Sequence, residues 1–461
     1  MIVTYWLLLA ILLATYASAL SRVMRHSRGL TPLLGWMVGL GYFLLTPLAI
    51  LTVRGGYDLP ASEGISEEWT RVNLANPVFF RPYLFVWLAM MLTALAAAIA
   101  SSRTASRGEN ASSTTASESH AIVPNISLRK LERAILIAMA LSLVDWAVLI
   151  WLVGGVAEFF VSHWYLRSEE LSARLGASFT LYTRISLANQ LLFTGAAALH
   201  TGLGLQQRTP RWKFTALIFV FLLIEMVMSG NRIFIAFYLL AFATSCWIYG
   251  RRKLIAVLLV AAPVLVILFS AWGLVRHDLS KIPDAVAGDG ESEISEQAIS
   301  SVMHATEGSA VMLLLHMVND FGGRFDYLQG STYGRLFTFW LPRSLYPGRP
   351  LDFTNQAAIY YLPGETTSLC STALGEACAN FGAAAIAVLP LFTLGVAAYT
   401  RYLARKPGGR PLLSAVSFVV LIWFARCTFA ENVFNLAEVA ALIWLLRLEV
   451  DLSLPSALLP S

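Results

Sequence analysis

Two arginines in a proline-rich turn are the first residues of this sequence with types and spacing suited to chemistry. Arg343 and Arg349 lie in the stretch 342–350 (PRSLYPGRP), which contains three prolines. Proline fixes its own φ angle, so this stretch holds two guanidinium groups at little further entropic cost. A guanidinium presents a planar fork of N–H donors that matches phosphate oxygens in bidentate fashion. The turn is therefore predicted to clamp a pyrophosphate.

Other arginines are candidates for the same ligand, and each has a simpler alternative. Arg232 ends the short turn SGNR, and Arg276 directly follows an apolar run. A cation at the edge of a membrane commonly extends its charged head to the interface without binding anything. Asp320 and Arg324 flank Phe-Gly-Gly, a spacing that also suits a plain ion pair between them.

Three residues are candidate proton acceptors. Glu376 lies in the segment 375–382 (GEACANFG), where it is either a general base or an ion-pair partner for an arginine. His316 and His304 come next, because histidine titrates near neutral pH. A lone histidine on the apolar face of 311–318 is more often a packed residue than a catalyst, so the structural alternative stays open for His316.

The composition indicates what must hold these residues in place. The chain has 461 residues, of which 57% are hydrophobic and 13% charged, whereas soluble proteins are about 25% charged. Its apolar runs are continuous and reach about 20 residues, which predicts membrane-spanning helices rather than a barrel. The predicted fold is an all-α membrane protein with eleven spans, at 4–20, 32–53, 83–100, 134–153, 186–204, 213–229, 232–249, 254–274, 382–400, 411–426 and 432–448.

The basic residues orient these spans. If the N-terminus lies outside, the inner segments hold 19 of the 33 basic residues, while the outer segments hold 14 basic and 20 acidic residues. This asymmetry follows the positive-inside rule and places the C-terminus in the cytoplasm. Of the 14 outer basic residues, 13 are arginine. That bias suits a phosphate-bearing ligand, although a general preference for arginine explains it equally well.

Three regions follow along the chain. Residues 1–274 form an eight-helix membrane region with a flexible cytoplasmic loop at about 101–128, which is rich in Ser, Thr and Ala. Residues 275–381 form a large outer loop with short helices, in which 308–318 is predicted to be an interfacial or re-entrant helix. Residues 382–461 contribute three helices and a short cytoplasmic tail.

Several function classes are disfavoured. The net charge of +5 and the pI near 9.0 do not indicate nucleic-acid binding, because the basic residues are dispersed between apolar runs. The four cysteines show no metal-binding spacing, so neither a metal nor another cofactor is predicted. Cys370 and Cys378 share an outer loop and are either a disulfide or two thiols. Asp145, Glu225 and Glu438 fall within spans, where acids are usually functional or paired inside the bundle.

The motif residues resemble a known family. The stretch from 329–333 (QGSTY) through 340–350 (WLPRSLYPGRP) resembles the signature of O-antigen polymerases, with Arg349 where that family has lysine. The segment 375–382 resembles the family's Gly-Glu-x-x-x-Asn-Phe-Gly motif before a helix, and 229–232 resembles its Gly-x-Arg turn. The likeness covers the architecture of most of the chain but only about 40 residues in motif.

The resemblance implies a polymerase of the bacterial inner membrane with a fold like that of GT-C-type glycosyltransferases. Its donor and acceptor would be oligosaccharide repeat units carried on undecaprenyl pyrophosphate at the periplasmic face. Membrane lipids would surround it, and a flippase and a chain-length regulator are further expected partners. A lipid pyrophosphate is the leaving group and needs preorganised cations. Arg232, Arg276, Arg343 and Arg349 are assigned to it, with Arg324, Asp320 and Tyr333 as further substrate contacts; Glu376, His316 and His304 are assigned to proton transfer.

Two alternatives remain. An O-antigen ligase uses the same donor but transfers the glycan to the lipid A–core, and it also combines many spans with a large outer loop. A flippase or other transporter of lipid-linked sugars would have charges lining its spans and internal repeat symmetry. The sequence shows few charges within its spans and no such repeat, which favours an enzyme.

Overall fold

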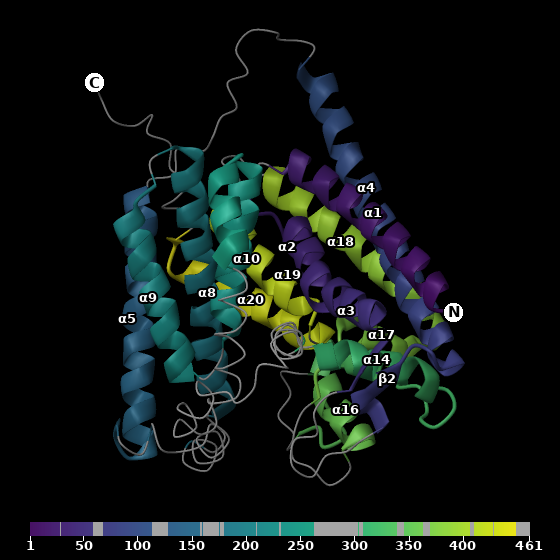
Figure 1. The fold of residues 1–461 in the computed structure, drawn as a ribbon. Coiled ribbons are helices and arrows are strands. Elements are labelled where there is room, and N and C mark those ends of the chain that lie inside the picture. Colours follow the sequence, from purple (N-terminus) through teal and green to yellow (C-terminus); the bar gives the residue numbers. More distant parts are fainter. Residues whose placement is uncertain are drawn as a thin grey trace, which may run out of the picture. The chain divides into compact units, whose positions relative to one another are not determined.

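The computed structural model of the chain is helical almost throughout (Figure 1). It describes residues 1–27, 29–58, 68–112, 128–156, 159, 175, 179–208, 210–229, 232–261, 303, 308–338, 345–362, 369–405, 410–426 and 428–448. Within these ranges the only strands are β1 (Gly56–Asp58) and β2 (Arg71–Asn73), which form a small antiparallel hairpin.

Six helical segments of the described chain are long and apolar enough to cross a membrane, which confirms the predicted class, an all-α membrane protein. They are Ile2–His26, Pro32–Arg54, Pro77–Ser102, Leu128–Val153, Trp212–Ser229 and Ala373–Arg405. Two shorter apolar helices, α10 (Ile233–Ile248) and α19 (Pro411–Phe424), coincide with two more of the predicted spans. The total of eleven spans stays a prediction.

The remaining predicted spans compare with the structure as follows. α8 (Phe179–Gln206) and α20 (Phe429–Leu445) cover the predicted spans at 186–204 and 432–448. The span at 254–274 begins in a helix at 252–261, and its remainder lies outside the described residues. α4 (Phe80–Ser112) continues well past residue 100, so the first part of the predicted flexible loop is helical.

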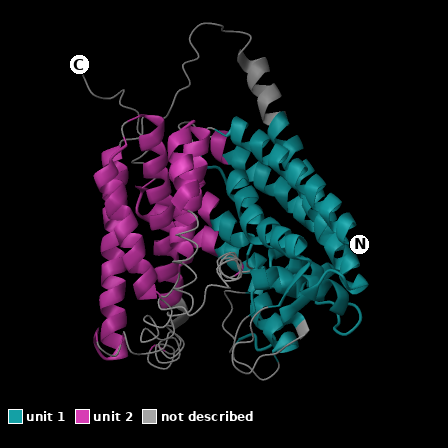
Figure 2. Ribbon diagram, in the orientation of Figure 1, with its two compact units in different colours: residues 1–119, 306–402, 420–434 teal, residues 120–305, 403–419, 435–461 magenta. Residues whose placement is uncertain are grey.

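The chain forms two compact units, each assembled from separate stretches of sequence (Figure 2). Unit 1 contains residues 1–119, 306–402 and 420–434, and unit 2 contains residues 120–305, 403–419 and 435–461. The two candidate segments at 329–350 and 375–382 therefore fall in the same unit.

In unit 1, α1 (Ile2–His26) and α4 run in the same direction and pack along each other. The ring of Tyr5 near the start of α1 contacts those of Phe80 and Tyr83 at the start of α4, with centroid distances of 5.9 and 4.7 Å. One turn further on, the indole N–H of Trp87 donates to the carbonyl of Leu8 at 2.7 Å. Tyrosine and tryptophan thus align the two helices at their first turns.

A helix with a π-helical turn packs beside this pair. α2 (Pro32–Leu40) passes through a π-helical turn at Gly41–Leu45 into α3 (Thr46–Arg54). The indole of Trp36 donates to the Thr393 hydroxyl of α18 (Ala385–Arg405) at 2.8 Å. Gly39 approaches the backbone of α19 so closely that a Cβ there would lie 2.7 Å from the Cα of Ile422. Small residues allow such close helix contacts in membranes.

Four short helices gather with the β hairpin at one end of unit 1, at the ends of α3 and α4 that the hairpin connects (Figure 1). They are α14 (Gly308–Asp320), α15 (Ser331–Thr338), α16 (Phe353–Tyr361) and α17 (Ala373–Phe381). α14, predicted to be interfacial or re-entrant, is buried for most of its length and packs against α17, α4 and α3. It forms part of the core of this end of the unit.

The opposite end of unit 1 is basic. Arg22 and Arg25 lie in the last turns of α1, and Arg401 lies near the end of α18. The hydroxyl of Thr400 accepts a hydrogen bond from the N–H of Leu33, so these ends lie on the same side as the start of α2. Unit 1 therefore separates its clustered short helices from its basic helix ends, and the side of the membrane on which each end lies stays a prediction.

Unit 2 is built around α8, which packs against α5 (Leu128–Val153), α9 (Trp212–Ser229) and α10. Asn189 donates to the carbonyl of Ala138 and the hydroxyl of Ser142, and these bonds join α8 to α5. The guanidinium of Arg251 donates to the carbonyl of Leu205 at 2.6 Å, which closes the junction between the ends of α10 and α8.

Candidate functional site

Glu376 is buried inside unit 1, in the first turn of α17. The helix begins at Ala373, and the side chain of Thr372 caps it by accepting a hydrogen bond from the Gly375 N–H. The Glu376 side chain is only 1% exposed. A carboxyl group in such a place needs hydrogen bonds that replace its lost water.

Both carboxylate oxygens of Glu376 have such partners. The hydroxyl of Thr332 donates to Oε1 at 2.7 Å, and the backbone N–H of Phe429 donates to Oε2 at 2.6 Å. The amide of Asn380 donates to the Thr332 hydroxyl oxygen and to the Glu376 carbonyl, each at 2.8 Å. The network joins three helices, because Thr332 belongs to α15, Glu376 and Asn380 to α17, and Phe429 to α20.

The helix positions of the two donors suit a negative charge. Thr332 is the second residue of α15, and Phe429 is the first residue of α20. The N-terminal turns of helices carry unpaired N–H groups and a partial positive charge. Glu376 is thus placed to hold the beginnings of α15 and α20 against α17, through Thr332 and the Phe429 N–H and not through the arginine that was its predicted structural partner. Its assignment as a general base stays a prediction.

Tyr333 covers this network with aromatic rings. Its ring centroid lies 5.2 Å from that of Phe381 and 4.8 Å from that of Phe429. Burial, and then the nearby charge of Glu376, raises the pKa of the Tyr333 phenol well above its usual value. The phenol is therefore a neutral hydrogen-bonding group and not a base.

The turn that begins α15 explains part of the sequence motif. Gln329 and Gly330 both adopt positive φ angles, of 49° and 81°. Glycine takes such angles without the steric penalty that a Cβ brings. Just before them, the N–H of Leu328 donates to the carbonyl of Ala379 at 2.9 Å. The turn is therefore fastened to α17, and it delivers Thr332 to Glu376.

An ion pair joins α15 to α16. Arg335 lies 3.0 Å from Asp352, and both side chains are largely buried, at 13% and 16% exposure. Asp352 is the N-cap of α16 and accepts hydrogen bonds from the N–H and side-chain amide of Asn355 and from the Thr354 hydroxyl. Arg349, in the proline-rich turn, lies three residues before this cap.

Asp352 is held as a carboxylate. Its burial alone would favour the neutral acid, but the hydrogen bonds from Thr354 and Asn355 and the charge of Arg335 outweigh that effect and lower its pKa. The group is therefore ionised at neutral pH and neutralises Arg335.

Asp320 and Arg324, which were predicted to form an ion pair, each contact an aromatic side chain. The Tyr361 hydroxyl donates to Asp320 at 2.8 Å, and burial together with the Asp320 charge raises the Tyr361 pKa. The Arg324 guanidinium lies 5.1 Å from the ring centroid of Phe325. A cation over an aromatic face is attracted to the ring. Asp320 and Arg324 are both predicted substrate contacts. They lie beside the buried hydrophobic cluster to which α14 and α16 contribute side chains.

His316 contacts the β hairpin. One ring nitrogen, Nε2, lies 3.0 Å from the carbonyl of Arg71, and the ring meets that of Phe79 edge-on at 5.1 Å. A hydrogen bond to a carbonyl requires a proton on Nε2, which leaves Nδ1 as the basic nitrogen of a neutral ring. The predicted packing role of His316 and a role in proton transfer are both compatible with this geometry.

For four other candidate residues, no contact with the residues around Glu376 is described. Arg276, His304 and Arg343 lie outside the described residues. Arg232 belongs to unit 2, where it immediately precedes α10. Its predicted convergence with the arginines of the proline-rich turn stays a prediction.

Cys370 and Cys378 are not joined to each other. Cys378 is a buried thiol on α17, outside any disulfide. In the described part of the chain, no three side chains among His, Cys, Asp and Glu gather as metal ligands.

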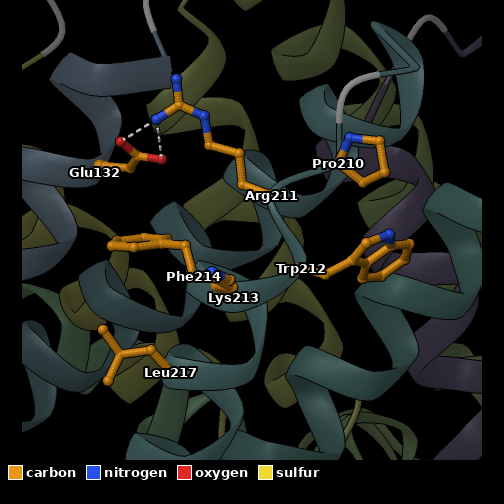
Figure 3. Close-up of a pocket in the computed structure, with 7 residues that line it drawn as sticks. All are labelled: Glu132, Pro210, Arg211, Trp212, Lys213, Phe214 and Leu217. Carbon is orange, nitrogen blue, oxygen red and sulfur yellow. Dashed lines mark hydrogen bonds and ion pairs between the residues drawn. The ribbon is translucent and has the colours of Figure 1, made fainter.

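Unit 2 carries an open hollow at its basic end (Figure 3). The guanidinium of Arg211 reaches both carboxylate oxygens of Glu132 at 2.6 and 2.7 Å. The hollow is lined by Glu132, Pro210, Arg211, Trp212, Lys213, Phe214 and Leu217. Arg211 and Lys213 belong to the residues predicted to face the cytoplasm, so this hollow lies away from the predicted working face.

Comparison with protein-family models, curated proteins and solved structures finds no match to this chain. The site therefore rests on the residues themselves.

Four residues of the cluster were absent from the sequence-based assignments, namely Thr332, Asn380, Arg335 and Asp352. Thr332 and Asn380 stand inside the motif segments, at the first turn of one helix and one turn after Glu376 in another. Their positions in the motif were a usable signal. The Arg335–Asp352 pair had no signal, because its partners are separated by the proline-rich turn and meet only in the folded chain.

Proposed function

We propose that this protein is a membrane-embedded polysaccharide polymerase, a glycosyltransferase that joins repeat units carried on undecaprenyl pyrophosphate. It works at the outer face of the bacterial inner membrane and produces O-antigen or a similar surface polysaccharide. Its partners are the lipid-linked donor and acceptor glycans, and it has eleven spans with the N-terminus outside and the C-terminus in the cytoplasm.

One observation carries the proposal. The motif segments 329–333 and 375–382, which are separate in the sequence, are joined through Thr332, Glu376 and Asn380. All three residues belong to the segments that resemble O-antigen polymerases, and each is almost completely buried. A shared role in one site explains why both segments carry the resemblance.

The chemistry assigns a role to each remaining group. An acceptor sugar hydroxyl attacks the anomeric carbon of the donor, the bond from that carbon to the pyrophosphate oxygen breaks, and the hydroxyl proton passes to a base. Negative charge develops on the departing pyrophosphate, which fixed guanidinium groups stabilise. We assign this role to Arg343 and Arg349, with Arg232 and Arg276 as further cations.

The base is assigned to His316 before Glu376. Both Glu376 oxygens already accept hydrogen bonds in a buried position, whereas His316 is only half-buried. With Nε2 donating to a carbonyl, Nδ1 is the proton-accepting nitrogen of the neutral ring. His304 is the remaining alternative.

Complementation of a deletion strain tests the proposal. The wild-type gene should restore long glycan chains, and Arg343→Ala and Arg232→Ala should leave single repeat units on the lipid core. Arg343→Lys, which keeps the charge but loses the bidentate fork, should be intermediate. Arg25→Ala, at the basic end of α1, is the matched control and should restore long chains.

The same strain separates the competing functions. A deletion that leaves no repeat unit on the core at all would indicate a ligase and overturn the assignment as a polymerase. Purified protein in detergent should elongate a lipid-linked repeat unit without a nucleotide sugar. Failure of wild-type protein to do so, with the repeat unit left intact, would argue for a transporter.

A further inference from the structure

The hollow of unit 2 lies where the starts of two helices meet (Figure 3). Glu132 contributes to it from the start of α5, and residues 210–217 contribute from the turn before α9 and the first turns of that helix. α8 packs against both helices, and its buried His200 contacts both sides of the hollow. His200 Nε2 lies 3.2 Å from Glu132 Oε1, and the His200 ring centroid lies 4.8 Å from that of Phe214. The hollow is therefore a feature of three packed helices, and the proposed glycosyl transfer does not use it.

Basic residues are concentrated at the helix ends that form the hollow. The stretches 128–133 and 206–213 hold six basic residues and one acidic residue, which is Glu132. The six basic side chains are all exposed, and they are Arg129, Lys130, Arg133, Arg208, Arg211 and Lys213. Such an excess of positive charge complements an anionic ligand.

Glu132 orients one of these cations. Both of its carboxylate oxygens accept hydrogen bonds from the same guanidinium nitrogen of Arg211, Nη1, at 2.7 and 2.6 Å. Figure 3 shows the other terminal nitrogen of this guanidinium pointing away from Glu132. The Arg211 side chain is 43% exposed. One nitrogen of the fork is thus anchored to α5, and the fork is held in an orientation that can present its other N–H groups to a second anion.

Lys213 is a second cation on the wall of the hollow. It belongs to the first turn of α9, lines the hollow and is exposed. The start of a helix carries a partial positive charge of its own, which favours a phosphate group nearby. Lys213, the Arg211 guanidinium and the start of α9 therefore act in the same direction on an anion in the hollow.

The remaining lining is apolar and continues onto the outer surface of α9. Trp212 and Leu217 line the hollow and are 47% and 44% exposed. Val220 and Ile224 follow Leu217 at helical spacing and are also exposed. In a membrane-spanning helix such a surface faces the acyl chains of the bilayer, and tryptophan is enriched at the boundary between chains and headgroups. The hollow thus joins a cationic region to an apolar surface.

We propose that this hollow is a binding site for one anionic phospholipid of the surrounding membrane. The lipid phosphate contacts Arg211 and Lys213, and an acyl chain lies along Trp212, Leu217 and Val220. A free phosphate ion would match the cations but leave the apolar surface uncovered. A zwitterionic lipid would cover that surface, but its own cation would meet the excess of positive charge. Only an anionic lipid matches both parts of the hollow.

Native mass spectrometry of the full-length protein, stripped of lipid in detergent, tests this site. Phosphatidylglycerol should bind with a lower dissociation constant than phosphatidylcholine with the same acyl chains. Lys213→Ala should raise the dissociation constant of phosphatidylglycerol about fivefold, the factor that one cation contributes near an anionic lipid surface. It should leave phosphatidylcholine binding and the unfolding temperature in detergent unchanged.

Lys253→Ala is the matched control. Lys253 is another exposed lysine of unit 2 near the start of a helix, the one at 252–261, and it does not line the hollow. Its replacement should leave the dissociation constant of phosphatidylglycerol unchanged. Equal losses for the Lys213 and Lys253 variants would show a diffuse attraction of lipid to basic helix ends and would overturn the proposal.

Tryptophan fluorescence locates the lipid in a protein that keeps all its cations. Phosphatidylglycerol with brominated acyl chains, added at one equivalent, should quench Trp212, so Trp212→Phe should lose part of the quenching seen in the wild type. Trp247→Phe, at an exposed tryptophan near the end of α10, should keep it. Equal quenching in the wild type and the Trp212 variant would place the lipid elsewhere and refute the site.

Two further ligands separate a lipid site from a site for soluble anions. Inorganic phosphate and glycerol 3-phosphate carry the charged group without acyl chains, and neither should displace phosphatidylglycerol at equal concentration. Displacement by either would show that the hollow binds a soluble phosphate and would overturn the assignment to a lipid. Equal dissociation constants for phosphatidylglycerol and phosphatidylcholine would overturn it as well, since the cations would then have no part in binding.

Discussion

The hydroxyl of Thr332 donates a hydrogen bond to Oε1 of Glu376 across 44 positions of sequence, at a distance of 2.7 Å. This bond brings the first turn of α15 to α17, and the Phe429 N–H brings the first turn of α20 to the other carboxylate oxygen. Glu376 therefore organises the end of unit 1 where the candidate residues gather, and its neighbours can be tested one at a time.

Replacement of Glu376 should destabilise unit 1 in proportion to the hydrogen bonds lost. Glu376→Gln keeps the shape and one good acceptor, so we expect a loss of about 1–2 kcal/mol in the free energy of unfolding. Glu376→Ala leaves both donors unsatisfied and a cavity, and should cost at least twice as much. Unfolding of the purified protein by titration with denaturing detergent measures both.

The matched control is Glu431→Gln, which changes an acid in the first turn of α20 that is only partly buried. It should cost less than about 1 kcal/mol, the usual value of a charge near a helix N-terminus. Equal losses in the free energy of unfolding for the Glu376 and Glu431 variants would contradict a specific stabilising role of the buried hydrogen-bond network.

Thr332 should be coupled energetically to Glu376. Thr332→Val removes the hydroxyl but keeps the side-chain shape, so Glu376 and Asn380 both lose a partner. A double-mutant cycle with Glu376→Gln should give a coupling energy of about 0.5–3 kcal/mol. Thr332→Ser retains the hydroxyl and should restore most of the stability. Additive effects of the two replacements would contradict the network.

Asp352 should make unit 1 sensitive to acid. Its pKa is lowered in the folded state by hydrogen bonds and by Arg335, whereas an unfolded Asp titrates near a pH of about 3.9. Its stabilising contribution is therefore complete above that value and is lost as the pH falls through the lower, folded pKa. Asp352→Asn should lower the unfolding temperature at pH 7 and flatten its decline in acid. An unchanged acid profile in this variant would refute the assignment.

Two glycines should be intolerant of a methyl group. At Gly39 a Cβ would lie 2.7 Å from the Ile422 Cα, and at Gly195 it would lie 2.5 Å from a side-chain atom of Val416. Gly39→Ala and Gly195→Ala should each cost about 1–3 kcal/mol, as overpacking of a well-packed core does. Gly395→Ala is the control, because nothing lies within 4 Å of the added Cβ, and it should be neutral or slightly stabilising. A comparable loss in the control would show that the close contacts are not responsible.

Much of the helical framework was predictable because membrane helices are encoded locally. A run of about 20 apolar residues has few alternatives to a helix in hydrocarbon, since each backbone group must find its partner within the segment. α1, α5 and α9 accordingly lie where the hydropathy placed them. Helix ends were less predictable, as α4 shows: its polar residues beyond position 100 still continue the helix.

The sequence by itself determined the membrane class and which segments carry candidate chemistry, because composition and proline spacing are local properties. Only the tertiary structure decided how Glu376 is used, because its partners Thr332 and Phe429 come from distant helix starts. The same holds for Asp145 and Glu225, which appear in the sequence as two isolated acids and accept hydrogen bonds from Ser186 and Gln190 of α8 only in the folded chain. Contacts between helices depend on which faces pack together, and hydropathy does not specify those faces when helices are apolar on all sides.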